Sequence, residues 1–370
     1  MKRLVVILCL ILASCLPSTQ GVYYTPPATN VPSVYATIQR CVDTSTFCYV
    51  SEGTYKTGTI NINKSGVTLQ AVGKVIIKGA VLVYGDGNTV RGFTLTDKQQ
   101  KAGIRIYGDN NLIEDNEIYD TLEDGIWFWG KDNVIRGNYI HDIYDDRNYP
   151  AYDNHVDCYM TMTWEAGNSA YNVAEDIVFD GNTCIHLRAH GSNQGAMIAG
   201  AVKNLTFKNN TFIMGDGLDG GYSPAFALYG GSGFILDNNN VCNTTGAGES
   251  FAWLEGVSGV TITNNVWTGY RTLYRGNGVI VQSGNIKGSL PCGVSPATPT
   301  ATKEFTWTNT PTLTTIRTPT RTNTPTVTIT KTYAPPTVQT STATATSAPT
   351  TTPPPCDAEY LPEICIYRIK

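Results

Sequence analysis

The 370-residue sequence predicts an all-β solenoid, in which short parallel strands stack coil upon coil. Three observations predict it: a degenerate repeat from about residue 67 to residue 281, an asparagine that recurs in its copies, and apolar side chains at alternate positions around that asparagine. Strands with one face inward show this two-residue alternation. No copy could bury its apolar face alone, so the copies must stack on their neighbours.

The repeat places turn-forming residues between its short strands. One copy reads Asn111-Leu-Ile-Glu-Asp-Asn116-Glu-Ile118 and is followed by the strand pattern Gly125-Ile-Trp-Phe128. Asn and Gly allow sharp turns, and stacked Asn side chains can hydrogen-bond along a column. The recurring asparagines are Asn116, Asn138, Asn182, Asn210, Asn239 and Asn265, in steps of 22, 44, 28, 29 and 26 residues.

A β-sandwich or a propeller with Asn-Gly turns is the alternative. Antiparallel hairpins need two-residue turns between strands of similar length. The longer steps between the asparagines, and their recurring register, favour parallel stacking instead.

The pattern resembles that of the right-handed parallel β-helix family, the pectate-lyase-like solenoids. The N-terminal cap is similar too, because Tyr35-Ala-Thr-Ile-Gln39 is followed by Tyr49-Val-Ser-Glu-Gly-Thr-Tyr55. The resemblance covers roughly residues 30–290. It implies a right-handed parallel β-helix solenoid of about 8–9 coils, which we expect over residues 31–292, followed by a disordered Thr/Pro-rich tail.

The composition excludes one class of partner. Only 15% of the residues are charged and the net charge is −4, whereas about a quarter charged is usual for soluble proteins. The chain has no Lys/Arg run or basic patch, so we expect no nucleic-acid partner.

The N-terminus predicts export. Two basic residues precede an apolar run too short to span a bilayer, which is typical of a signal peptide over residues 1–15. Leu12-Ala-Ser-Cys15 resembles the lipobox of bacterial lipoproteins, in which Cys15 would be acylated; ordinary cleavage a few residues later is the alternative. We therefore expect an extracellular or cell-surface protein that meets the membrane only through such an anchor.

Composition also divides the rest of the chain. We expect a short linker over residues 16–30, before the solenoid. From residue 293 to residue 355 Thr, Pro, Ala and Ser dominate, and such a stretch cannot bury a core, which predicts a disordered linker. Residues 356–370 would form a short tail, too small to fold without a disulfide.

Eight cysteines remain after Cys15, and an even count in an exported chain permits four disulfides. Cys41 and Cys48 would close a short loop in the N-terminal cap. Cys158 and Cys184 fall at inward positions of neighbouring coils, where they could pair or remain buried thiols. The other two pairs would be Cys242–Cys292 and Cys356–Cys365.

The repeat is interrupted once. The step from Asn138 to Asn182 is twice the step before it. Either one coil is too divergent to recognise, or one coil carries two long loops. We favour two loops, since insertions in repeat proteins map to loops on one face. Residues 156–160 would then be a strand between loops at 142–154 and 161–174.

Alternation predicts an outward aromatic surface. If Ile126 and Phe128 point inward, Trp127 and Trp129 point outward. Sugar rings stack on aromatic planes, so this surface suits a glycan; a hydrophobic seam under the loops is the alternative. The same phase turns outward Arg105, Tyr107, Asp157, Tyr159, Met197, Ala227 and Trp253.

Titratable side chains gather at the interruption. Histidine titrates near neutrality and suits acid–base chemistry, although a single loop histidine is more often a surface hydrogen-bonding group. Residues 153–157 could bind Ca2+ through oxygen atoms, without forming a recognised calcium loop. The residues of this cluster are His141, His155, His186 and His190, with the carboxylates of Asp124, Asp145, Asp146 and Glu165.

The family resemblance implies an exported enzyme that acts on a polysaccharide, most directly a lyase of acidic, uronate-containing glycans. As a lyase, it would use His155 or His190 as the base, Arg188 or Arg105 to bind the carboxylate, and Tyr159 as proton donor. As a hydrolase, it would use Asp157 and Asp124. The predicted substrate-binding residues are Arg105, Trp127, Trp129, Asp124, Glu165 and Trp253.

Two motifs of the family are missing. The Gly-His-Gly of pectin hydrolases is only partly matched by Ala189-His190-Gly191, and the Arg-Pro dipeptide of pectate lyases is absent. The alternative function is a non-catalytic glycan-binding or adhesive surface protein, which the Thr/Pro stalk and the lipid anchor favour. A purely structural shaft is a third.

Overall fold

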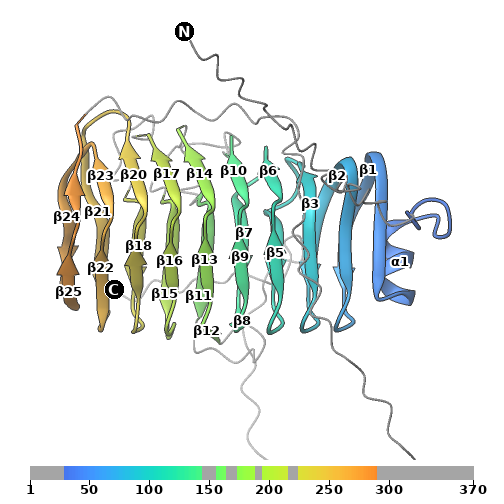
Figure 1. Cartoon of the computed structure of the whole chain (residues 1–370), viewed down its shortest axis with the longest axis horizontal. Coiled ribbons are helices and arrows are strands. Elements are labelled where there is room, and N and C mark those ends of the chain that lie inside the picture. The colour runs from blue at the N-terminus through green and yellow to red at the C-terminus, as the bar shows by residue number, and fades with distance from the viewer. Residues whose placement is uncertain (1–28, 144–155, 164–172, 188–193, 216–223, 290–370) are drawn as a thin grey trace, which may run out of the picture. The chain divides into compact units, whose positions relative to one another are not determined.

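The computed structural model describes residues 29–143, 156–163, 173–187, 194–215 and 224–289. These residues form one short helix and a stack of parallel strands, in which most strands are hydrogen-bonded to their counterparts in the coils before and after them (Figure 1). This is the parallel solenoid that the sequence predicts.

The short strands form three walls around one apolar core. The first wall holds β5 (Leu112–Glu114), β9 (Val134–Arg136), β13 (Val178–Asp180), β16 (Thr206–Lys208), β19 (Ile235–Asp237), β22 (Val260–Thr263) and β25 (Val279–Ser283). The second wall holds β6 (Glu117–Tyr119), β10 (Tyr139–His141), β14 (Thr183–His186), β17 (Thr211–Met214), β20 (Asn240–Asn243), β23 (Val266–Thr268) and β26 (Ile286–Lys287). The third wall holds β4 (Ala102–Ile106), β7 (Asp124–Phe128), β11 (Tyr159–Thr163), β15 (Ala196–Gly200), β18 (Phe226–Tyr229), β21 (Gly248–Glu255) and β24 (Tyr270–Gly276).

Longer strands begin the solenoid. β1 (Phe47–Ile62) and β2 (Thr68–Val83) bend around more than one wall, and β3 (Thr89–Leu95) pairs with strands of the first and second walls. β8 (Gly130–Lys131) and β12 (Ala174–Glu175) pair with each other in a small separate sheet.

The recurring asparagines form a ladder between the first and second walls. The Asn138 main-chain N–H donates to Asn182 Oδ1 at 2.9 Å, and Asn138 Nδ2 donates to the Ile113 carbonyl at 2.9 Å. The residue before each ladder position has a positive φ, such as 56° at Asp115 and 63° at Gly137, which favours Asp, Asn and Gly there. The ladder comprises Asn116, Asn138, Asn182, Asn210, Asn239, Asn265 and Asn285.

The glycine before an inward strand is required by close backbone approach. A Cβ at Gly125 would lie 2.7 Å from the Cys158 carbonyl oxygen in the next coil. In this copy of the Gly-apolar-x-apolar pattern, the glycine therefore lies where the backbone of the next coil leaves no room for a side chain.

The long step is one coil, as we predicted. Asn138 and Asn182 are direct neighbours in the ladder, and β10 pairs in register with β14. The strand of that coil on the third wall, however, is 159–163 rather than 156–160. Tyr159 lies opposite Ile126, and Met160 lies opposite Trp127.

This shift reverses two predicted orientations, because one residue of slip moves a side chain to the other face. Tyr159 is fully buried and points into the core, where its ring lies 5.1 Å from Phe179 and 6.3 Å from Phe212. Asp157 is also fully buried. Burying a large aromatic ring in an aromatic interior is the physical reason for this phase. The predicted outward positions of Asp157 and Tyr159 were wrong.

Two predicted disulfides are confirmed. Cys158 and Cys184 are bonded across the interior and both are fully buried, so they are not free thiols. Cys41 and Cys48 are bonded in the N-terminal cap. Cys242 is disulfide-bonded as well. Its predicted partner, Cys292, lies outside the described residues, and so do Cys15, Cys356 and Cys365.

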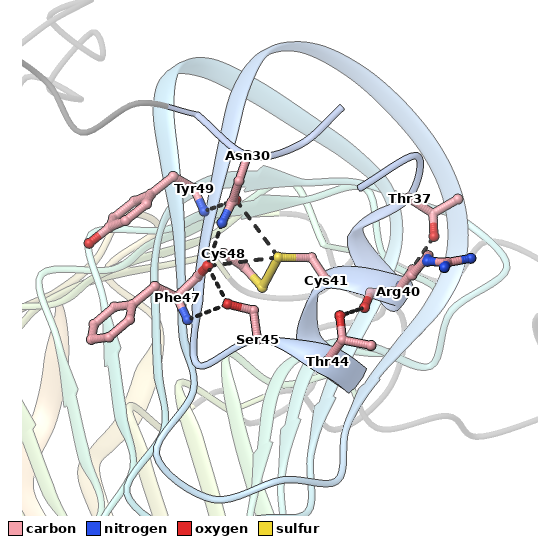
Figure 2. Close-up of a disulfide and its surroundings, with 9 residues drawn as sticks. All are labelled: Asn30, Thr37, Arg40, Cys41, Thr44, Ser45, Phe47, Cys48 and Tyr49. Carbon is pink, nitrogen blue, oxygen red and sulfur yellow. Dashed lines mark hydrogen bonds between the residues drawn. A yellow bond between two sulfur atoms is a disulfide. The ribbon is translucent and has the colours of Figure 1, made fainter. Parts of the chain in front are cut away.

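The N-terminal end of the core is closed by helix α1 (Ile38–Thr44), which packs Ile38 and Val42 against it. The Thr37 side chain caps the helix by accepting the Arg40 N–H at 3.1 Å. Figure 2 shows Asn30 beside the Cys41–Cys48 bridge, donating to the Phe47 carbonyl at 2.6 Å and accepting the Tyr49 N–H at 2.8 Å.

The last described coil carries polar residues at inward positions. Lys287 lies opposite Trp267, and its Nζ is 4.7 Å from the centre of the Trp267 ring. A polar side chain at an inward position is typical of the terminal repeats of a solenoid.

Candidate functional site

One outward column runs the length of the third wall. The predicted positions of Arg105, Trp127, Met197, Ala227 and Trp253 in one column are confirmed by the strand register. Sequence analysis missed two members, because Met160 replaces the residues we assigned in its coil and Arg275 extends the column beyond Trp253. Aligning the coils on their inward residues would have found Arg275.

The side chains of this column are accessible to solvent at its two ends and buried in its middle. Met197 is 8% exposed and Ala227 is fully buried, whereas Arg105, Trp127 and Trp253 are half-buried. The prediction of a continuous exposed sheet was therefore wrong for the middle coils. The two ends are the accessible parts of the wall.

At the end nearer the N-terminus, a cation lies over an indole. The Arg105 guanidinium carbon is 4.8 Å from the centre of the Trp127 ring. Among the residues that the structure describes, Arg105 has no ion-pair partner, and its buried Nε has no hydrogen-bond partner. The guanidinium is therefore available to an acidic ligand.

Trp129 belongs to a packed aromatic stack. It is only 5% exposed, its ring is parallel to that of Tyr107 at 5.1 Å, and Tyr107 stacks on Tyr84 at 4.7 Å. Its Nε1 donates to the Met162 carbonyl at 3.1 Å. Of the two alternatives for the tryptophans, the packed seam describes Trp129, whereas Trp127 is half-buried beneath Arg105.

Two carboxyl groups are enclosed where the third wall begins. Asp124 Oδ1 accepts the Asp157 N–H at 2.6 Å, and Asp157 Oδ1 accepts the Gln194 N–H at 2.7 Å. Asp124 Oδ2 accepts the Trp127 indole N–H. Within the described part of the chain, Asp157 Oδ2 and Gln194 Oε1 have no hydrogen-bond partner. Gln194 was not predicted as part of the site, because its place beside Asp157 follows only from the register of the coils.

Burial dominates the titration of this pair. It raises the pKa of Asp124 to about 8, against the opposing effect of the hydrogen bonds from Trp127 and Asp157. Burial and the charge of Asp124 likewise raise the pKa of Asp157 well above its usual value. The folded protein thus keeps protons that the unfolded chain releases above about pH 4, so the free energy of unfolding falls as the pH rises toward 8.

His186 is enclosed beside this pair. Its Nε2 donates to the Val156 carbonyl at 2.6 Å, and its Nδ1 has no hydrogen-bond partner. Burial lowers the pKa of His186 to about 4, although the hydrogen bond to Val156 opposes this. His186 is therefore a neutral, buried group in the structure.

His141 belongs to the second wall and lies apart from the third-wall column in the fold. Its ring stacks between Tyr139 at 4.3 Å and Tyr119 at 5.2 Å. Its Nδ1 is 2.8 Å from Asp142 and its Nε2 is 3.4 Å from Glu117. Burial lowers its pKa, but hydrogen bonds and charges from the two carboxylates outweigh burial and raise the pKa above its usual value.

At the other end of the column, Trp253 lies beneath a second arginine. The Arg275 guanidinium carbon is 4.7 Å from the centre of the Trp253 ring. Both Glu249 oxygens accept hydrogen bonds from Arg275 Nη1 at 3.0 Å. Arg275 is thus neutralised by its own chain, unlike Arg105.

A model of the right-handed β-helix region matches residues 79–265, about half of the sequence. The chain belongs to the right-handed β-helix family. None of the curated proteins matches this β-helix chain significantly.

Several solved structures are similar to this β-helix protein. The A-module of an Azotobacter vinelandii mannuronan C-5 epimerase is 14% identical with a TM-score of 0.34, over 69% of this chain and 94% of that one. The Dettilon tailspike protein is 15% identical with a TM-score of 0.36, over 70% and 57%. The tailspike protein of E. coli bacteriophage HK620, in complex with a pentasaccharide, is 10% identical with a TM-score of 0.32, over 74% and 65%.

Several predicted site residues of the β-helix protein lie outside the described residues. Of the possible calcium-binding segment, residues 153–157, only the last two residues are described. Within the ranges that the structure describes, no group of three or more His, Cys, Asp or Glu side chains is placed to hold a metal ion. In the same ranges, no helix is long and apolar enough to cross a membrane. The residues outside are Asp145, Asp146, His155, Glu165, Arg188 and His190.

Proposed function

We propose that this β-helix protein is exported and processes an acidic, uronate-containing polysaccharide at its third wall, most directly as a polysaccharide lyase. The observation that carries the proposal is the Arg105–Trp127 pair, an unpaired guanidinium over a half-buried indole. A guanidinium binds a carboxylate through two parallel hydrogen bonds. An indole packs on the apolar face of a sugar ring. One uronate residue offers both groups.

The lyase reaction needs a neutralised carboxylate and a base. Arg105 would bind the uronate carboxylate, which acidifies the adjacent C–H group. The base would take that proton, the bond to the leaving oxygen would break as a carbon–carbon double bond forms, and the leaving oxygen would take a proton from water. His155 or His190 stays our prediction for the base, with Arg188 as a second carboxylate ligand. Tyr159 is not retained as proton donor, because its hydroxyl lies in the core.

The second candidate is a protein that binds the same glycan without cleaving it. One observation favours it: the carboxyls of Asp124 and Asp157 and the imidazole of His186 are enclosed. A general acid or base must lie within hydrogen-bond reach of the substrate. Under this alternative, the third wall would supply affinity alone.

The test uses the full-length chain with oligomers of galacturonate, mannuronate, guluronate and glucuronate, and with neutral oligosaccharides for comparison. Binding is measured by calorimetry and cleavage by the absorbance and mass of unsaturated products. Arg105→Ala and Trp127→Ala should each weaken binding about 10-fold, since 1.4 kcal/mol corresponds to that factor. Phe47→Ala, an exposed aromatic on the cap, and Arg136→Ala, an exposed arginine on the first wall, are the matched controls.

Three outcomes decide between the candidates. Unsaturated products from the wild type support the lyase. Binding without any product supports the non-catalytic protein. Equal affinities for Arg105→Ala and Arg136→Ala, or no binding of any uronate oligomer, would overturn the role given to the Arg105–Trp127 pair.

A further inference from the structure

The Asp124 carboxyl links an outward side chain to the next coil. Its Oδ2 accepts the Trp127 indole N–H, and its Oδ1 accepts the Asp157 main-chain N–H at 2.6 Å. Asp124 is 1% exposed, whereas Trp127 is half-buried. An enclosed acid thus anchors the edge of a half-buried ring.

We propose that Asp124 is a positioning residue that fixes the Trp127 indole under Arg105, and that the charge of the Asp124 carboxyl sets how firmly the indole is held. The inference rests on the proposed function for its biological meaning, because Trp127 is the sugar platform there. Asp124 itself would touch no substrate.

Among the described residues, two ring contacts also hold the indole in place. Trp129 meets it edge to face with ring centres 6.0 Å apart, and Arg105 covers it at 4.8 Å. Neither contact fixes the rotation of the ring as a directional hydrogen bond does. Without an acceptor at position 124, the indole N–H would lose its partner in a partly desolvated place, which is unfavourable. The ring would then turn to reach water.

The charge on the carboxyl is set by its surroundings. Burial disfavours the ionised form most strongly, and the neighbouring charge of Glu123 adds to this. Hydrogen bonds from Trp127 and from the Asp157 N–H favour ionisation, as does the charge of Arg105. The Asp157 carboxyl in the next coil also carries a raised pKa. A hydrogen bond to an ionised acceptor is roughly twice as strong as one to a neutral acceptor, so the indole is held more firmly once Asp124 has lost its proton.

The test observes the indole N–H directly in the 15N-labelled full-length protein. Trp127→Phe assigns its NMR signal by loss. In the wild type we expect solvent exchange of this proton to be slowed at least 10-fold relative to an exposed indole, with a signal that shifts around pH 8. Asp124→Asn keeps one carbonyl acceptor for two N–H donors and carries no charge, so the protection should fall and the pH shift should vanish. Asp124→Ala should lose the protection.

Asp86→Ala is the matched control, because the Asp86 carboxylate also accepts a main-chain N–H from the next coil, that of Asp109 at 2.8 Å. It should leave the Trp127 signal unchanged. Protection that survives in Asp124→Ala, or a pH shift that survives in Asp124→Asn, would overturn the inference. If Asp124→Ala does not fold, the pH profile of Asp124→Asn still decides.

Galacturonate oligomers then separate this inference from the proposed function. Asp124→Ala should weaken their binding about as much as Trp127→Ala, and Asp124→Asn should weaken it less, because one carbonyl acceptor remains. If the wild type binds no uronate oligomer, the proposed function fails, while the NMR result alone decides whether Asp124 positions the ring.

Discussion

Replacing Tyr159 by Phe tests the inward orientation of the irregular coil. The Tyr159 hydroxyl is buried and has no hydrogen-bond partner. An unsatisfied buried polar group costs about 1–3 kcal/mol, and Tyr159→Phe removes it while keeping the ring among Phe179, Phe207 and Phe212. We expect the free energy of unfolding to rise by about 1–3 kcal/mol, measured by chemical denaturation at equal m value. The melting temperature should rise by roughly 2–4 °C per kcal/mol.

Tyr159→Ala is the comparison. It removes the ring as well, and we expect a loss of about 3–5 kcal/mol from the lost burial and the cavity. A proton donor at this position would give the opposite pattern, with lost cleavage and unchanged stability in Tyr159→Phe. A clear destabilisation of Tyr159→Phe, or loss of activity with the fold intact, would refute the inward orientation.

Three further predictions concern the ladder, the carboxyl pair and the cap. Asn182→Ala removes a buried side chain that accepts the Asn138 N–H and donates to the Ile135 carbonyl, both in the coil before. The free energy of unfolding should therefore fall by about 2–4 kcal/mol. The control Asn63→Ala, at an exposed position, should change it by about 0.5 kcal/mol or less. In the wild type, Asp124 should lower the free energy of unfolding by up to about 1.4 kcal/mol per pH unit between about pH 4 and pH 8, and Asp157, whose pKa is also raised, should steepen this fall; Asp157→Asn should reduce the slope, and an unchanged slope would contradict the raised pKa of Asp157. Replacing Cys41 and Cys48 by Ser should cost about 2 kcal/mol, from the short loop that the bridge closes; equal stability of the wild type with and without reductant would argue against it.

The fold was predictable because its signal is local and repeated. Each ladder asparagine stands in the same short pattern, so the register of the walls followed from aligning Asn138 with Asn182 and its neighbours. The interpretation of the long step as a single coil was confirmed on the same basis, while most of the two predicted loops lies outside the described residues. Cys158 and Cys184 were placed inward because alternation and coil order leave few other positions.

The candidate site was less predictable, because its geometry depends on a single-residue phase. Apolar side chains at 156, 158, 160 and 162 alternate as an inward strand would. The structure instead turns Tyr159 inward and Met160 outward. No pattern in the sequence states that an aromatic ring will outcompete two methionines for the core. Burial of Asp124 and Asp157 is equally a tertiary property, set by neighbouring coils.

The disulfide between Cys158 and Cys184 is fully buried. A reductant in solution can therefore reach it only after the neighbouring coils separate locally. The survival of that bond in the presence of a thiol reagent therefore reports whether the irregular coil ever opens. The rate at which this disulfide is reduced would thus measure local opening of the irregular coil, and the measurement needs no ligand.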